Sequence, residues 1–340
     1  AGTTAAVAML VGAPIVGADG TNPEAPLRGD RALDAAAAWG DGLSGVRAPV
    51  LPAPAATESL IVVLEGGGSA SEPAPGRRAR ATEISRTHDR LQPVLAGLGA
   101  RISHRYRVLM NAVAVDVPAG RASQIAALPQ VVAVHPVTLL APASLTPRPL
   151  PAPAPTPSTA PARLGRSGPT LALIDGGVDA AHPALGGGIG PGRPIAGGRD
   201  FVAGDDDPSM GTGPVHLEAH GTAMAGIVLG APELQELGPD LAPRLHVHRV
   251  VALERAGGQI QPLARSDRVI AALELSVDPD GDGDPADRAD VILLGVAQGF
   301  SGAGPDPLSD AVWRAETAGS VVVAPAGNDG ATLAGIGSIG

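Results

Sequence analysis

The sequence predicts an α/β protein in two parts, a small α+β unit followed by a larger unit with a parallel sheet and helices on both faces. Apolar runs between residues 58 and 138 follow the order strand, helix, strand, strand, helix, strand. After residue 168, continuous apolar runs alternate with amphipathic segments, which is typical of a parallel sheet covered by helices. Residues 141–168 are dominated by Pro, Ala, Ser and Thr, a composition that favours an extended linker between the two parts.

The smaller unit is predicted to be ferredoxin-like, because its element order is that of a split βαβ motif. Residues 60–64 form its first strand, a run of β-branched and apolar residues. Pro93 argues against one continuous helix over residues 82–98, since proline has no backbone N–H to donate. The remaining expected elements are strands over 102–109 and 112–117 joined through Met110 and Asn111, a helix over 120–128 and a strand over 131–134.

The larger unit is predicted to alternate strands and helices. The expected strands cover 171–174, 247–253, 291–296 and 321–324, and the expected helices cover 220–229, 263–275 and 308–317. In open parallel sheets, the residues that carry chemistry lie at the carboxyl ends of the strands.

Composition excludes several classes of function. The net charge is −10, and no basic run exceeds three residues, so a nucleic-acid partner is not expected. The chain has no cysteine, which excludes a disulfide framework, a thiol nucleophile and a cysteine-based zinc site.

The first 18 residues resemble the hydrophobic region and cleavage site of a secretory signal peptide. An apolar segment without this role is the alternative. A polar, Ala- and Pro-rich segment follows over residues 19–57. Nothing else is long and apolar enough to span a bilayer, so we expect a secreted or cell-surface protein without a membrane span.

Three segments place polar residues where an active site would lie in such a sheet. Asp175 follows the strand over 171–174 and precedes two glycines, and His220 opens a helix of small apolar residues. Asn328 follows the strand over 321–324, after Gly327. Each has a structural alternative when taken alone, since turn aspartates, capping histidines and turn asparagines are common.

Together the three segments, Asp-Gly-x-x-Asp, His-Gly-Thr-x-x-Ala-Gly and Ala-Gly-Asn, resemble the successive active-site segments of subtilisin-like serine peptidases, the subtilases. The resemblance implies a serine endopeptidase. It also implies that Asp175 orients His220, that His220 takes the proton of a serine hydroxyl, and that Asn328 donates to the oxyanion.

Residues 58–140 resemble the inhibitory propeptide found before subtilase domains, including the closing segment over 128–134. In the family this unit assists folding and caps the active site until it is cleaved. The resemblance therefore implies a zymogen with its own propeptide as an intramolecular partner, a maturation point within 141–168 and a catalytic domain over 169–340. An unrelated ferredoxin-like binding domain is the alternative.

The chain departs from the family pattern in two places. The family nucleophile lies in a Gly-Thr-Ser-x-Ala segment after the oxyanion asparagine, and no serine of this chain has that context. We therefore expect an incomplete catalytic domain that is inactive as given. Where the family commonly has Asn-x-Ser-Leu-Gly, this chain has Leu294, Gly295 and Val296, whose backbone groups suffice to pair with a substrate strand.

One acidic segment resembles the start of a calcium loop, with carboxylates at alternate positions around glycines. Its candidate ligands are Asp278, Asp280, Asp282 and Asp284. The EF-hand pattern would place Glu at position 289, where this chain has Ala. Structural calcium is therefore one hypothesis and a solvated acidic turn is the other, and catalysis itself requires no cofactor.

The favoured hypothesis is a peptidase zymogen that acts on polypeptides. The alternative is an inactive pseudopeptidase that serves as a binding or folding module. A calcium-stabilised adhesion module is a third hypothesis, resting on the acidic segment and the Pro-rich linker alone.

Overall fold

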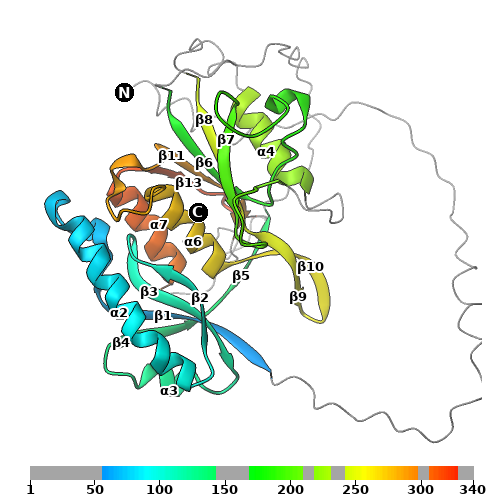
Figure 1. Ribbon diagram of the computed structural model, residues 1–340. Helices are drawn as coiled ribbons and strands as arrows, with labels where there is room; N and C mark the ends of the chain where they lie inside the picture. The colour runs from blue at the N-terminus through cyan, green and yellow to red at the C-terminus, as the bar shows by residue number, and fades with distance from the viewer. Residues whose placement is uncertain (1–55, 143–167, 210–217, 231–241, 298–305, 328–340) are drawn as a thin grey trace, which may run out of the picture.

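The computed structural model describes residues 56–142, 168–209, 218–230, 242–297 and 306–327 (Figure 1). The expected signal peptide, nearly all of the Ala- and Pro-rich segment after it, most of the linker and Asn328 lie outside these residues. None of the described helices is long and apolar enough to cross a membrane.

The smaller unit is a four-stranded antiparallel sheet with two helices. Its elements are β1 (Thr57–Gly67), α2 (Arg77–Gly97), β2 (Arg101–Tyr106), β3 (Met110–Pro118), α3 (Ala122–Ala126) and β4 (Val131–Pro136). The strand order is β2-β3-β1-β4, with antiparallel pairing throughout. The predicted order of strands and helices in this unit is confirmed.

Both faces of this sheet are buried, because alternate residues of β1 point to opposite sides. Leu60 and Val62 pack in one cluster with Leu91 and Leu95 of α2. Ile61 belongs to a second cluster, which includes the helices of the larger unit. The sheet therefore lies between its own helices and those of the larger unit (Figure 1).

Two expectations for this unit are wrong. Pro93 does not interrupt α2, because it lies on the exposed face of the helix. Met110 and Asn111 are not the connection between the two middle strands, since β3 already begins at Met110. The connection is residues 107–109, whose backbone N–H groups donate to the carboxylate of Glu274 in the larger unit.

The larger unit has a five-stranded parallel sheet of order β13-β11-β6-β8-β7. Its strands are β6 (Thr170–Asp175), β7 (Ile195–Asp200), β8 (Arg244–Arg249), β11 (Val291–Leu294) and β13 (Val321–Val323). Helix α4 (Glu218–Gly230) covers one face, while α6 (Ser266–Val277) and α7 (Pro307–Ala318) cover the other, between the two sheets (Figure 1). The predicted α/β class with helices on both faces is confirmed.

Three predicted elements of this unit have different bounds. The strand expected over 247–253 is two strands, β8 and β9 (Val251–Ala256), which part at Val250. The helix expected over 263–275 begins at Ser266, because the preceding residues belong to β10 (Gln259–Arg265). The strand expected over 291–296 ends at Leu294. Strand β7 and the hairpin of β9 and β10 were not among the predicted elements.

A third sheet joins the two units and has the order β12-β5-β10-β9. Strand β5 (Leu139–Pro142) follows the smaller unit, and it lies between β12 (Val296–Ala297) and β10 of the larger unit. Leu140 of β5 is fully buried in the same cluster as Val269 and Val296. The chain thus inserts a strand into the larger unit, and this strand includes the first two residues of the expected linker.

Candidate active site

Asp175 ends the central strand of the parallel sheet. Strand β6 pairs with β8 on one side and β11 on the other, so its carboxyl end lies between two neighbours. Asp175 has no exposed surface. Its backbone carbonyl accepts a hydrogen bond from Val250 at 2.8 Å, and its Oδ1 accepts one from the backbone N–H of Gly176 at 2.6 Å. The carboxylate is therefore held rigidly in the protein interior.

His220 lies in the first turn of α4 and faces that carboxylate. Its Nδ1 lies 2.9 Å from Oδ1 and 2.8 Å from Oδ2 of Asp175. The helix can come this close because position 221 is glycine. A Cβ at Gly221 would lie 2.1 Å from the carbonyl oxygen of Gly177.

This contact fixes the chemistry that the histidine can perform. An ionised carboxylate only accepts hydrogen bonds, so the Nδ1 that faces Asp175 carries the proton. In the neutral ring, Nε2 is then the basic nitrogen, and the carboxylate stabilises the imidazolium that forms when Nε2 takes up a proton. The side chain of His220 is 10% exposed. The pair predicted from two distant segments is thus brought together with the geometry of a general base and its orienting acid.

The predicted substrate-binding residues lie beside this pair. Leu294 and Val296 are buried in the core between the sheet and α6, so only their backbone groups can face a peptide. Gly295 lies directly against Asp175, and a Cβ there would come within 1.8 Å of Oδ2. Asn328 lies outside the described residues, and its predicted role stays a prediction.

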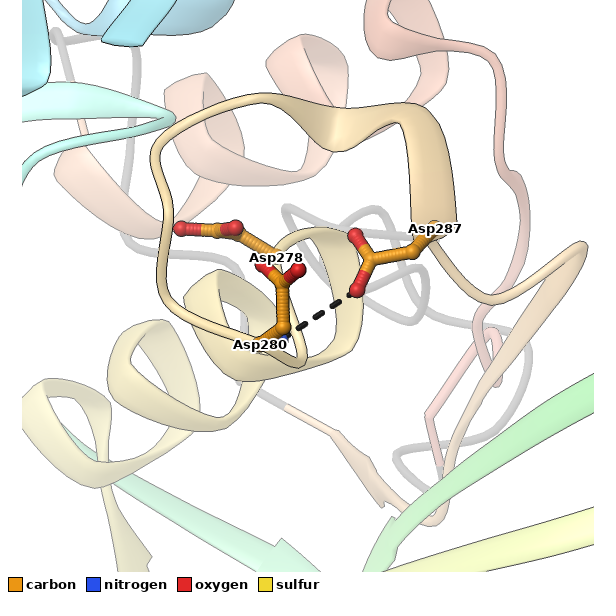
Figure 2. Close-up of side chains that lie close together, drawn as sticks. All are labelled: Asp278, Asp280 and Asp287. Atoms are coloured by element: carbon orange, nitrogen blue, oxygen red, sulfur yellow. Dashed lines mark hydrogen bonds between the residues drawn. The ribbon is translucent and has the colours of Figure 1, made fainter.

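The predicted calcium ligands divide into two groups. Asp278 and Asp280 lie together, and Asp287 joins them from the 3-10 helix η6 (Pro285–Asp287), as Figure 2 shows. Asp284 instead pairs with Arg77 of α2 at 3.1 Å, and Asp282 pairs with Arg78 at 2.6 Å.

Sequence reasoning missed two residues, Asp287 and Glu274, and one contact, that of Gly295 with Asp175. Asp287 lies seven residues beyond Asp280, outside the spacing of the loop pattern used to search for ligands. The contact of Gly295 with Asp175 joins two different strands, and no local pattern signals it. Glu274 looks like an ordinary charged residue of a helix, but its carboxylate receives backbone N–H groups from the smaller unit.

Comparison with known proteins gives relatives of one kind. The chain is 34% identical over 169 residues to the thermophilic serine proteinase of Bacillus sp. (strain AK1), covering 49% of this chain and 35% of that protein. It is 32% identical over 166 residues to thermitase of Thermoactinomyces vulgaris, covering 49% of this chain and 50% of that protein. The chain therefore spans half or less of the length of these curated relatives.

Among solved structures, the epidermin leader peptide processing serine protease of Staphylococcus aureus is similar, with a TM-score of 0.46 and 14% identity. That match covers 81% of this chain and 61% of the other. The model of the subtilase family matches residues 166–338, just over half of the chain, which include both Asp175 and His220. The chain belongs to the subtilase family.

Proposed function

We propose that the protein is a secreted serine endopeptidase, made as a zymogen, in which Asp175 and His220 act with a serine that lies outside these 340 residues. The observation that carries this proposal is the buried Asp175 carboxylate, held 2.8 and 2.9 Å from Nδ1 of His220. A binding scaffold gains nothing from such a pair at the carboxyl end of its central strand, whereas acyl transfer needs it.

In this mechanism His220 Nε2 takes the proton of the serine hydroxyl while the serine oxygen forms a bond to the scissile carbonyl carbon. Asp175 keeps the ring oriented and stabilises the imidazolium. Asn328 is proposed to donate a hydrogen bond to the oxyanion of the tetrahedral intermediate. His220 then gives its proton to the leaving amine as the C–N bond breaks, and water hydrolyses the acyl-enzyme by the same steps in reverse.

The substrate class follows from the third sheet. Strand β5 lies between β12 and β10, where Ala141 is opposite Ala297 and Leu140 is opposite Ala264. A site that accepts an extended strand between two others binds peptides through their backbone and reads alternate side chains. We propose that a polypeptide substrate takes the place of β5 along β12, next to Gly295 and Asp175.

The smaller unit is proposed to inhibit the enzyme by holding β5 in this position. Three contacts outside the sheet support this role. Thr138 and Ser266 exchange hydrogen bonds of 3.0 and 2.9 Å, and the Tyr106 hydroxyl donates to the carbonyl of Asp267 at 2.8 Å. The Glu274 carboxylate accepts the backbone N–H groups of residues 107–110 at 2.7 to 3.4 Å. Cleavage within the linker after Pro142 would leave β5 bound until the smaller unit is removed.

The test begins with the coding sequence downstream of the Gly340 codon. An open frame that reaches a Gly-Thr-Ser-x-Ala segment supplies the proposed nucleophile. After removal of the smaller unit, the full protein should then react with a fluorophosphonate probe, and His220→Ala should abolish this labelling. His182→Ala is the matched control, because His182 is exposed and caps the 3-10 helix at Pro183–Leu185. A full protein without such a serine, or one that the probe does not label after removal of the smaller unit, would instead be a pseudopeptidase.

Export is proposed from the signal-like segment at residues 1–18 and is tested separately. The protein expressed with its native N-terminus should appear in the culture medium, and its N-terminal sequence should begin after Ala18. Retention of the whole chain in the cell would contradict this part of the proposal.

A further inference from the structure

Three charged side chains end neighbouring strands of the parallel sheet and lie in one row. Asp175 of β6 is opposite Arg249 of β8, and Arg249 is opposite Asp200 of β7 on its other side. Paired residues of parallel strands point to the same face, and residues two places earlier share that face. Those earlier residues, Leu173 and Val247, lie in the cluster that α4 covers. The row therefore faces α4, whose first turn contacts the Asp175 carboxylate.

Arg249 and Asp200 form an ion pair that is largely withdrawn from solvent. Nη1 of Arg249 donates to Oδ2 of Asp200, and the two side chains are 20% and 4% exposed. The other oxygen of Asp200 accepts the backbone N–H groups of Val202 and Ala203 at 2.6 and 2.9 Å. A carboxylate with three donors, one of them charged, has little freedom to move. The guanidinium of Arg249 is thus held at a fixed place at the end of β8.

The stem of Arg249 packs against the turn that follows Asp175. Gly177 of this turn has a φ of +91°, a left-handed conformation that favours glycine. A Cβ at Gly177 would lie 3.1 Å from Cδ of Arg249 and 2.9 Å from the carbonyl oxygen of Pro208. That carbonyl also accepts the N–H of Val178 at 3.2 Å. The turn is therefore held both by the arginine and by the loop that follows β7.

The same turn supports the first turn of α4. The carbonyl oxygen of Gly177 would lie 2.1 Å from a Cβ at Gly221, so the helix rests directly on the turn at this point. One residue further along the helix, the Thr222 hydroxyl accepts the N–H of Asp179 at 2.8 Å. The turn thus contacts both the arginine of the ion pair and the segment of α4 that contains His220.

We propose that Arg249 and Asp200 are positioning residues for the pair of Asp175 and His220. Their ion pair fixes the turn on which both members of the pair depend. This keeps both oxygens of Asp175 within hydrogen-bond distance of Nδ1 of His220. The catalytic consequence rests on the proposed function, whereas the geometric claim concerns the 340-residue chain itself.

Loss of the ion pair should change the hydrogen bond of His220 in the folded protein. Without its partner, the Arg249 side chain would no longer be held against Gly177, and the turn would relax. Asp175 and the first turn of α4 would then shift relative to each other. Hydrogen bonds of this kind have lengths of about 2.7–3.2 Å, so a shift of roughly 0.5 Å would weaken the contact. A misplacement of about 1 Å can lower the rate of a reaction by about 100-fold.

NMR of the 340-residue chain with labelled histidine tests the geometric claim. The proton on Nδ1 of His220 has a resonance that depends on its hydrogen bond to Asp175, and His220→Ala identifies this resonance among those of the 8 histidines. We expect Asp200→Asn and Arg249→Met to shift it upfield. Its exchange with water should become faster by about 10-fold, because a hydrogen bond to a charged group is weakened.

Asp206→Asn is the matched control. Asp206 pairs with Arg199 at 2.6 Å, in the same loop as Asp200, but the two side chains are 84% and 37% exposed. The substitution is the same, and it should leave the resonance unchanged because exposed ion pairs restrain their surroundings little. Arg249→Lys keeps the charge and should move the resonance less than Arg249→Met, and it replaces that variant if Arg249→Met fails to fold.

Turnover of the full protein gives a second readout. After removal of the smaller unit, Asp200→Asn should lower kcat by about 10- to 100-fold and leave KM within about 3-fold, because it acts on the histidine and not on substrate binding. Asp206→Asn should keep kcat within about 2-fold.

Two results would overturn the proposal. An unmoved resonance in Asp200→Asn and Arg249→Met would show that the ion pair serves stability alone, even if both variants have lower melting temperatures. An equal shift in Asp206→Asn would assign the effect to the charge of the loop and not to the ion pair. The NMR comparison requires no activity, so it decides this inference even if the full protein proves to be a pseudopeptidase.

Discussion

Leu140 offers a direct test of how the smaller unit is held on the larger one. It lies on β5, between β10 and β12, with no exposed surface. Its neighbour Leu139 lies on the same strand, points to the other face and is 40% exposed. The substitutions Leu140→Ala and Leu139→Ala therefore remove the same atoms from the same strand, one from the core and one from the surface.

The expected magnitude follows from this burial. Leu140→Ala removes about three carbon atoms from a closed cluster, and burial contributes about 0.8 kcal/mol for each CH2 group. The cavity left behind adds to this loss, and measured Leu→Ala changes in cores lie at about 2–5 kcal/mol. We expect a loss near 3 kcal/mol for Leu140→Ala and less than about 0.5 kcal/mol for Leu139→Ala.

Two measurements on the full chain separate global from local effects. Urea unfolding gives the change in the free energy of unfolding. Hydrogen exchange reports whether β5 alone detaches, because peptides that contain β10 and β12 would then lose protection while the parallel sheet keeps it. Indistinguishable stability and exchange in the two variants would refute the conclusion that β5 is anchored by Leu140.

Three further predictions follow from buried groups. Gly295→Ala should displace Asp175, because a Cβ there would lie 1.8 Å from Oδ2, and should lower the free energy of unfolding by about 1–3 kcal/mol. The displacement should also alter the imidazole N–H resonance of His220, which is measured by NMR. Gly226→Ala is the control and should leave that resonance unchanged, because a Cβ there meets no atom within 4 Å. Burial raises the pKa of Glu274 to about 7, so the folded chain binds a proton near neutral pH that the unfolded chain binds only near pH 4.5. As the pH falls from about 7.5 to about 5, the free energy of unfolding of the wild type should therefore rise by about 2 kcal/mol relative to that of Glu274→Gln. Urea unfolding that gives parallel stability–pH profiles for the two proteins would contradict this. Burial lowers the pKa of His248 to about 3, so its contribution to stability is full above about pH 6.5 and is lost as the pH falls below that value. At about pH 5 the free energy of unfolding of the wild type should have fallen by about 2 kcal/mol more than that of His248→Gln. An equal fall in the two proteins, measured by urea unfolding, would show that His248 is not buried in its neutral form.

The sequence allowed the order of elements and the pairing of Asp175 with His220 to be predicted, because both depend on local signals. The strand over 60–64 is an apolar β-branched run that fits a strand buried on both faces. Asp175 and His220 were found because each lies in a short segment next to glycines, and those segments resemble a known family. Their contact at 2.8 Å then follows from the meeting of β6 and α4 at one end of the sheet.

The errors lie where contacts between distant residues set the boundaries. The strand that was expected to continue past Val250 breaks there, and the N–H of Val250 donates to the carbonyl of Asp175. The connection after β2 was displaced to residues 107–109 because Glu274 supplies acceptors for its N–H groups. Asp287 was omitted from the acidic group because η6 brings it back toward Asp280, whose N–H it accepts at 3.2 Å. None of these contacts has a local pattern.

Helix α6 connects the features that matter for the proposed function. It begins directly after β10, the neighbour of β5, and it ends just before Asp278. Between these ends it presents the Glu274 carboxylate to the smaller unit. The ion pairs of Arg77 and Arg78 are partly exposed, and such pairs contribute about 0–1 kcal/mol each. The buried contacts at Leu140 and Glu274 should therefore dominate the free energy with which the smaller unit docks on the larger one.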